Sequence, residues 1–305
     1  MEKQTTLHTP ITLAGPGLHT GQHVNVTIGP AAANTGYTLR RVDLNPPVEF
    51  QALATYVSDT SRGTTLSQGN ARVCTIEHLL SALHGLDIDN ALIEVSGEEI
   101  PILDGSARPW VEAIQKAGIT TLEAPRHYYE INERIEFSVP ETGASYIAEP
   151  YDGLAIDSTI QFESKVIGRQ QHSIDGFSTY ASGIAPCRTF VFLHEIAPLL
   201  AMNLIKGGAL DNALVFVDHP IQPEQMDHLA RVYGKDADSF KVNNGVLNTI
   251  EPYFPNEPAR HKLLDFVGDI MLTGCRIKGR FTICCPGHKS NVVFAQHLLQ
   301  KMTQK

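Results

Sequence analysis

A histidine and an aspartate one helical turn apart carry the clearest chemical signal of the chain. The apolar residues of segment 257–272 recur with the period of a helix, and His261 and Asp265 lie within it. Side chains at this spacing project from one side of a helix, as the two metal-binding histidines of an H-E-x-x-H motif do. Asp269 extends the same stripe by one turn. The spacing indicates metal ligands, and the alternative is a solvated face on which His261 and Asp265 only pair with each other.

A second helix supplies a neighbouring glutamate and histidine. The apolar pattern predicts a helix over residues 75–86, with Glu77 and His78 beside its apolar stripe. A hydrolytic zinc site needs three protein ligands, an open position for water and a carboxylate that acts as base. His78 is a candidate third ligand and Glu77 a candidate base. Adjacent helical residues point about 100° apart, so both serve one site only if it lies between their directions.

A third candidate follows a glycine between a strand and a helix. His288 comes after Gly287, between a predicted strand over 277–285 and a predicted helix over 291–302. Loops at such junctions commonly carry functional residues. A histidine there can act as a general acid or stabilise an oxyanion. A plain loop histidine is the alternative, because the chain has 13 histidines.

The predicted elements recur in the same order in both halves of the chain. Each half has a helix with candidate site residues, then a strand, a glycine-containing loop and a last helix. In the first half these are 75–86, a strand over 90–95, and a helix from Ser106, its expected N-cap, to Gly118. Residues 23–28 and 128–139 are predicted strands. We interpret the order as an internal duplication with its boundary near Pro125.

The composition excludes several classes of protein. Of 305 residues, 42% are hydrophobic and 19% charged, which is typical of a globular protein. The net charge of −9 argues against broad nucleic-acid binding. No run reaches the roughly 18 to 20 apolar residues that span a bilayer, and no signal-peptide core follows Met1, so we expect a cytoplasmic location. The five cysteines form no C-x-x-C pair, which favours reduced thiols.

Several segments together resemble the UDP-3-O-(3-hydroxyacyl)-N-acetylglucosamine deacetylase family of Gram-negative bacteria. The resemblance covers nearly the whole chain, and the segments come in the family's order. They are GLHTG (17–21), TIEHLLSAL (75–83), EIPILDGSA (99–107), RTF (188–190), GG (207–208), the matching positions of RHKLLDFVGD (260–269) and GH (287–288).

The resemblance implies a zinc centre. His78, His261 and Asp265 match the zinc ligands, and Glu77 matches the general base that activates the zinc-bound water. Zinc is the usual metal for two histidines and one aspartate, but iron(II) also accepts this set. The implied reaction is hydrolysis of the 2-acetamido group of UDP-3-O-(3-hydroxyacyl)-N-acetylglucosamine, which releases acetate early in lipid A biosynthesis.

Further site residues follow from the same resemblance. His288 matches a histidine that stabilises or protonates developing charge, and Asp269 matches the carboxylate that orients it. Lys262 matches a lysine near the substrate and its nucleotide. Thr189 matches a hydroxyl that helps to polarise the amide carbonyl, and Phe190 matches an aromatic residue beside the substrate.

An acyl-chain tunnel is also implied, formed by an insertion over about residues 193–216. Its predicted apolar wall includes Ile196, Ile205, Ala209, Leu210 and Ala213. From the pattern alone, an ordinary amphipathic helix packed on the core is the alternative. One loop departs from the family pattern, because Arg62 and Gly63 stand where many members carry apolar or sulfur-containing residues. Contacts at that edge of the site are therefore not predicted from the family.

The fold that the resemblance implies is α+β, with two similar domains at residues 1–124 and 125–305. Each domain pairs a sheet with helices, and the zinc site lies between them. The expected partner is the acylated UDP-N-acetylglucosamine; we expect a monomer, and nothing in the sequence indicates membrane contact. Two other functions stay open: a metal hydrolase of the same fold acting on another amide or ester, and a nucleotide-sugar-binding protein without catalysis.

Overall fold

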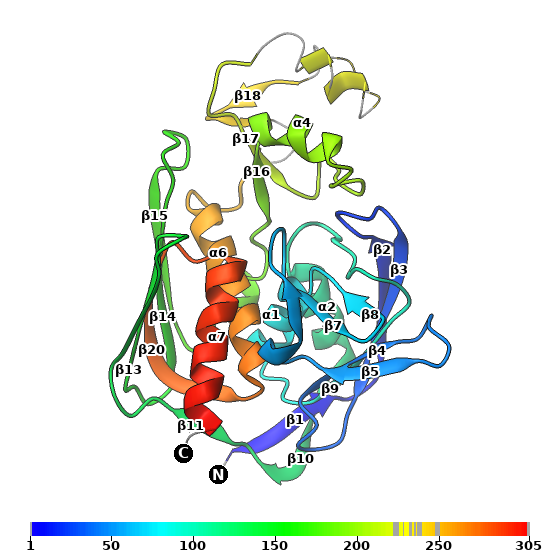
Figure 1. The fold of residues 1–305 in the computed structure, drawn as a ribbon, viewed down its shortest axis with the longest axis vertical. Helices are drawn as coiled ribbons and strands as arrows, with labels where there is room; N and C mark the ends of the chain where they lie inside the picture. Colours follow the sequence, from blue (N-terminus) through cyan, green and yellow to red (C-terminus); the bar gives the residue numbers. More distant parts are fainter. Residues whose placement is uncertain are drawn as a thin grey trace.

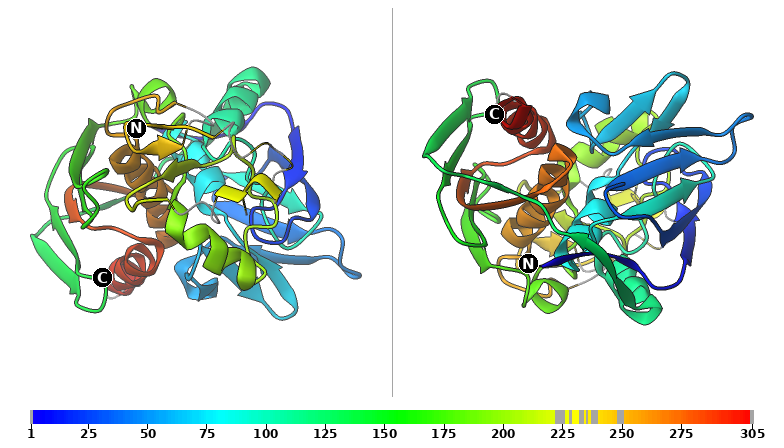
Figure 2. Two further views of the ribbon diagram at one scale, coloured as in Figure 1. Left: turned by 90° about the horizontal axis from the view of Figure 1, so that it is seen from above. Right: turned by 90° about the horizontal axis from the view of Figure 1, so that it is seen from below.

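Two β-sheets face each other across a layer of helices (Figure 1). The computed structural model describes residues 2–221, 226–227, 229–231, 234, 236, 240–247 and 251–303. Figure 2 shows the same order of sheet, helices and sheet from above and from below. The helices that carry the candidate site residues thus lie in the middle layer.

The first sheet is built from the N-terminal part of the chain. Its strands, in spatial order, are β2 (Ile11–Pro16), β3 (His23–Pro30), β9 (Ala91–Val95), β4 (Tyr37–Arg41) and β5 (Val48–Gln51). The last strand in sequence, β9, enters the middle, antiparallel to β3 and parallel to β4. A parallel pair requires a long crossover, and this crossover contains α1 (Glu77–Gly85). The helix α2 (Arg108–Ala117) follows β9.

The second sheet repeats this plan. Its main strands, in spatial order, are β12 (Ile135–Val139), β13 (Ala144–Glu149), β20 (Arg276–Cys284), β14 (Leu154–Gln161) and β15 (Arg169–Asp175). Here β20 enters the middle, antiparallel to β13 and parallel to β14. The crossover before it contains α6 (Glu257–Asp269), and α7 (His288–Thr303) follows it. The predicted α+β class with two similar halves is confirmed.

The remaining elements connect and extend the two halves. β1 (Lys3–Leu7) pairs with β10 (Ile119–Pro125), and β11 (Tyr128–Glu130) joins β20. A small sheet contains β6 (Val57–Asp59), β7 (Thr65–Gln68) and β8 (Ala71–Val73), preceded by η1 (Ala54–Tyr56). The domain boundary at residue 125 stays a prediction.

A further four-stranded sheet lies beyond one end of the helix layer, at the top of Figure 1. It is formed by β16 (Phe190–Phe192), β17 (Leu214–Phe216), β19 (Val246–Leu247) and β18 (Val242–Asn243). The helix α4 (Leu193–Ala201) connects β16 with the loop that leads to β17. Between β15 and β16 lies the short helix α3 (Tyr180–Gly183).

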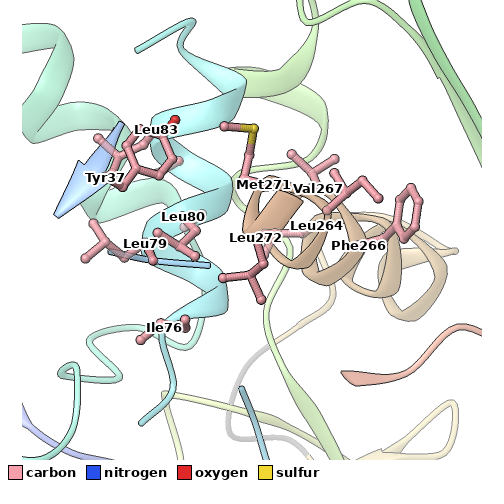
Figure 3. Packing of buried hydrophobic residues seen from close by; sticks show 14 of the residues in the cluster. Tyr37, Ile76, Leu79, Leu80, Leu83, Leu264, Phe266, Val267, Met271 and Leu272 are labelled. Atoms are coloured by element: carbon pink, nitrogen blue, oxygen red, sulfur yellow. The ribbon is translucent and has the colours of Figure 1, made fainter. Parts of the chain in front are cut away.

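The helices α1 and α6 pack against each other in the centre of the molecule. Apolar side chains of α1, α6 and the following η3 (Ile270–Thr273) share one hydrophobic core, and Figure 3 shows them from close by. At Gly268 the backbones approach so closely that a Cβ atom would overlap the carbonyl oxygen of Glu77. Only glycine fits there, because it has no side chain. This close approach brings the candidate residues of the two helices together.

Several predicted boundaries differ from the structure. The predicted strand over 128–139 is two strands, β11 and β12, on different partners. The helix expected from Ser106 begins at Arg108, whose N–H donates to the Ser106 hydroxyl. The predicted helix over 257–272 ends as α6 at Asp269 and continues as η3. Among the described residues, no helix is both long enough and apolar enough to cross a membrane.

Candidate active site

The start of α1 is tied to a neighbouring loop by a buried carboxylate. Glu99 accepts hydrogen bonds from the backbone N–H groups of His19 and Thr20, at 2.9 and 2.8 Å. It also accepts one from the Thr75 hydroxyl at 3.1 Å, and Thr75 has a φ of 57°. Three donors satisfy a carboxylate that is fully buried. Glu99 thereby helps to hold the turn from which α1 begins at Glu77.

His78, His261 and Asp265 meet in the interior. Their candidate ligand atoms all lie within 4.8 Å of one another. Asp265 Oδ1 is 3.4 Å from His261 Nε2 and 3.7 Å from His78 Nε2. These side chains are buried, so the solvated helix face considered from the sequence is wrong.

The cluster fits a tetrahedral metal centre. The distances to Asp265 Oδ1 exceed hydrogen-bond length, and among the described residues this buried atom has no hydrogen-bond partner. Ligands 2.0 to 2.1 Å from a tetrahedral zinc ion stand about 3.3 Å apart, close to the observed separations. An orphaned carboxylate oxygen facing two imidazole nitrogens is costly unless a cation joins them.

The protonation states agree with metal binding. Burial lowers the pKa of His78 to about 3 and that of His261 to about 4, so both imidazoles are neutral at pH 7. His261 Nδ1 lies 3.1 Å from the Cys187 carbonyl oxygen, which assigns the N–H to Nδ1 and leaves Nε2 free. Burial alone raises the pKa of Asp265. His261, which is protonated at the acid pH where Asp265 titrates, and Lys262 outweigh burial and hold this pKa well below its usual range.

A glutamate and a histidine face each other beside the cluster. Glu77 Oε1 lies 3.9 Å from His288 Nε2, and Asp265 Oδ2 lies at the same distance from that nitrogen. Burial raises the pKa of Glu77 to about 7, although the charge of His288 lowers it. Burial lowers the pKa of His288, but Glu77 and Asp265 outweigh burial and raise it to about 9. At neutral pH His288 is therefore an imidazolium, and Glu77 is present both as a carboxylate and as a carboxylic acid.

His288 is held by Asp269, and it opens α7 rather than lying in a loop. Its Nδ1–H donates to Asp269 Oδ2 at 3.2 Å. Asn291, one turn further along α7, donates to the same oxygen at 2.9 Å. Tyr146 in turn donates to the Asn291 side-chain oxygen at 2.7 Å. This chain of hydrogen bonds fixes the imidazole ring.

Lys262 and Phe190 flank the cluster on the side of the four-stranded sheet. Lys262 Nζ donates to Asp265 Oδ2 at 2.9 Å. Burial lowers the pKa of Lys262, but Asp265 outweighs burial and the pKa is raised. The Phe190 ring lies edge-on to His261, with centroids 6.3 Å apart. Thr189 precedes Phe190 at the start of β16, and its backbone N–H donates to the Gly105 carbonyl oxygen.

An apolar cavity of about 130 Å³ begins beside Thr189 and Phe190. It is lined by four of the five residues predicted for the acyl-chain wall: Ile196, Ile205, Ala209 and Ala213. Leu210 does not line the cavity; it is buried in the adjacent apolar cluster, which also contains Leu193 and Val215. Arg62 lies at this cavity together with His19.

Several groups around the site were not singled out from the sequence. They are the Glu99 carboxylate, the Thr64 backbone and hydroxyl, the Cys187 carbonyl and the Asn291 amide. Glu99 lies in the segment EIPILDGSA (99–107), whose resemblance to the family could have marked it as a site residue. Backbone groups such as the Cys187 carbonyl are present in every residue, so the residue type does not indicate their role.

A second histidine–aspartate group lies on the surface. His194 and His219 each place Nδ1 within hydrogen-bond distance of Asp218 Oδ1, at 2.9 and 2.8 Å. The two histidine side chains are 45% and 68% exposed. Direct hydrogen bonds satisfy this aspartate oxygen, in contrast to the unpartnered oxygen of Asp265. We therefore assign no metal to this group.

Comparisons with known proteins agree with the site. The family model described as UDP-3-O-acyl N-acetylglycosamine deacetylase matches residues 4–230 and 235–300. The bifunctional enzyme LpxC/FabZ of Porphyromonas gingivalis is 44% identical over 100% of this chain and 66% of the relative. The UDP-3-O-acyl-N-acetylglucosamine deacetylases of Saccharophagus degradans and Coxiella burnetii are 40% and 36% identical over 95% and 98% of this chain, and over 88% and 91% of the relatives.

The relatives differ in how much of their length this chain covers. It spans 64% to 66% of three bifunctional relatives, and about nine tenths of the deacetylases just named. The family match extends over both halves of the fold and includes every candidate ligand. The chain therefore belongs to the LpxC family of UDP-3-O-acyl N-acetylglycosamine deacetylases.

Proposed function

We propose that this chain is a zinc-dependent amide hydrolase that removes the acetyl group from UDP-3-O-(3-hydroxyacyl)-N-acetylglucosamine, an early step of lipid A biosynthesis. The observation that carries the proposal is the buried group of His78, His261 and Asp265, whose orphaned oxygen calls for a cation. Membership of the deacetylase family supports the reaction and the substrate. Domains at 1–124 and 125–305 are part of the same proposal.

His78, His261 and Asp265 would hold the metal through neutral imidazoles and a carboxylate. Bound there, zinc supplies Lewis-acid chemistry: it makes water acidic near neutral pH and polarises an acyl oxygen. Glu77, with a pKa near 7, is suited to accept a proton from the attacking water and to deliver it later. The water oxygen becomes part of acetate, the C–N bond breaks, and the amine leaves with the delivered proton.

The neighbouring residues stabilise charge and hold the substrate. The His288 imidazolium, oriented by Asp269, can donate to developing negative charge or to the leaving nitrogen. The Thr189 hydroxyl is our candidate for a donor to the amide oxygen. Lys262 supplies a positive charge beside Phe190. This charge would attract the anionic nucleotide part of the substrate.

The proposed activity is tested by acetate release from this substrate before chelation, after chelation and after zinc is restored. We expect activity to disappear on chelation and to return with zinc. Activity that survives complete metal removal would overturn the metal mechanism. An inactive, metal-loaded protein would overturn the substrate assignment, and a panel of other amides and esters would then be tested.

The apolar cavity is proposed to bind the acyl chain. We expect Ala213→Phe, which fills this cavity, to lower kcat/KM for the acylated substrate by about 15- to 60-fold. This is the effect expected when two or three methylene groups of the acyl chain lose their apolar contacts. Turnover of the same UDP-sugar without its acyl chain should be unchanged. Ala201→Phe is the matched control, because Ala201 is exposed at the end of the same insertion's helix. Equal losses on both substrates would remove the cavity from the proposal.

A further inference from the structure

Thr64 contacts both acidic side chains that flank the metal ligands. Its backbone N–H donates to Glu77 Oε2 at 2.9 Å, and its hydroxyl donates to Asp269 Oδ1 at 2.6 Å. Its carbonyl oxygen accepts from the N–H of Ile76, the residue before Glu77. Thr64 itself is fully buried. One residue thus holds the two carboxylates through separate groups.

These contacts join the two halves of the fold. Thr64 comes from the loop between β6 and β7, in the first half, whereas Asp269 ends α6 in the second half. The other oxygen of Asp269 is occupied by His288 and Asn291. The Thr64 hydroxyl is therefore the donor that fixes the carboxylate from the side of Glu77.

The loop before Thr64 is shaped to admit the Glu77 carboxylate. Gly63 has a φ of 157°, and a Cβ atom at this position would lie 2.8 Å from Glu77 Oε1. That distance is shorter than van der Waals contact, so a side chain would push the carboxylate away. The absence of a side chain at 63 and the N–H of Thr64 thereby set the position of Glu77.

We propose that Thr64 is a positioning residue for hydrolysis: it fixes Asp269, and through it His288, relative to Glu77. The inference rests on the proposed deacetylase function. A base and an acid 3.9 Å apart act on one substrate only while their separation is kept. The Thr64 hydroxyl supplies this restraint without a charge of its own, from a fully buried position against Asp269.

The test compares a substitution that removes the hydroxyl with one that keeps it. Thr64→Val keeps the shape and the backbone N–H but removes the hydroxyl, whereas Thr64→Ser keeps the hydroxyl. We expect Val to lower kcat by about 10- to 100-fold, the usual effect of losing a hydrogen bond to a charged group, with KM within about twofold. Ser should stay within about threefold of the parent protein. Thr65→Val, a buried neighbour that does not touch the two carboxylates, is the control.

The route through Asp269 is tested by combining substitutions. Adding Thr64→Val to Asp269→Ala should lower kcat by less than about threefold relative to Asp269→Ala alone, because the partner of the hydroxyl is already gone. Rates are expressed per bound metal, so a loss of folded protein does not imitate the effect.

Three outcomes would overturn the inference. They are equal kcat values for Thr64→Val and Thr64→Ser, a change confined to KM, or a loss of kcat from Thr64→Val that is as large in the Asp269→Ala variant as in the parent protein. The unsubstituted protein, measured in the same assay, tests the proposed function separately. If it turns over and the Val and Ser variants do not differ, only the role of Thr64 fails.

Discussion

Replacing Glu77 with alanine is expected to abolish nearly all deacetylation while the protein keeps its metal. The proposed general base sits beside the ligand cluster but is not one of its three members. General base catalysis is typically worth about 100- to 10,000-fold, so kcat should fall by that range. The measurement is acetate release together with metal content after dialysis.

Glu77→Gln separates the chemistry from the packing. The amide oxygen can still accept the hydrogen bond from the Thr64 N–H, but the group no longer takes up a proton. We expect Gln to be nearly as inactive as Ala and closer to the parent protein in thermal stability. Glu98→Ala, which removes an exposed carboxylate that is not part of the cluster, should leave kcat within about twofold. Near-normal turnover by the Gln variant would remove Glu77 as the base.

His261→Ala is expected to abolish metal binding and, with it, deacetylase activity. Loss of a group that merely supports a ligand typically costs 10- to 100-fold in metal affinity, and loss of a ligand should cost more than about 100-fold. Dialysed protein should then contain little metal. Because a ligand that binds only the folded state stabilises it, the rise in Tm on adding zinc should also disappear.

His84→Gln is the matched control for the metal prediction. His84 is also buried and neutral, since burial lowers its pKa to about 3, but its Nδ1 faces the Val267 carbonyl and lies outside the cluster. This variant should keep its metal and its zinc-dependent rise in Tm. Full metal occupancy in His261→Ala would refute the ligand role of His261.

Local sequence determined the pairs of site residues that share one helix. The spacing of His261, Asp265 and Asp269 was enough to place them on one side of a helix, because the helical period depends only on residues a few positions apart. The same locality made the elements predictable, including β20 and α7 within a few residues. The repeated order of elements predicted an internal duplication, and the five main strands of the two sheets do follow the same order, with β11 added in the second.

Tertiary structure decided what surrounds each of these helices. A helix pattern alone did not reveal that the polar stripe of α6 faces α1 rather than water; the close approach at Gly268 decides that. Similarly, Leu210 and Ala213 are both apolar, and only the path of the loop places Ala213 on the cavity and Leu210 in the cluster behind it.

By itself, then, the sequence determined the helices α1, α2, α6 and α7, the strands β3, β9 and β20, and the shared face of His261, Asp265 and Asp269, since these depend on neighbours close in the chain. The family resemblance supported His78 as the third candidate ligand. Only the tertiary structure decided that His78 joins His261 and Asp265, and that Thr64 reaches Asp269 from 205 residues away. The physical reason is that such contacts depend on how the two halves pack, and a hydroxyl or a backbone N–H carries no periodic signal of its partner.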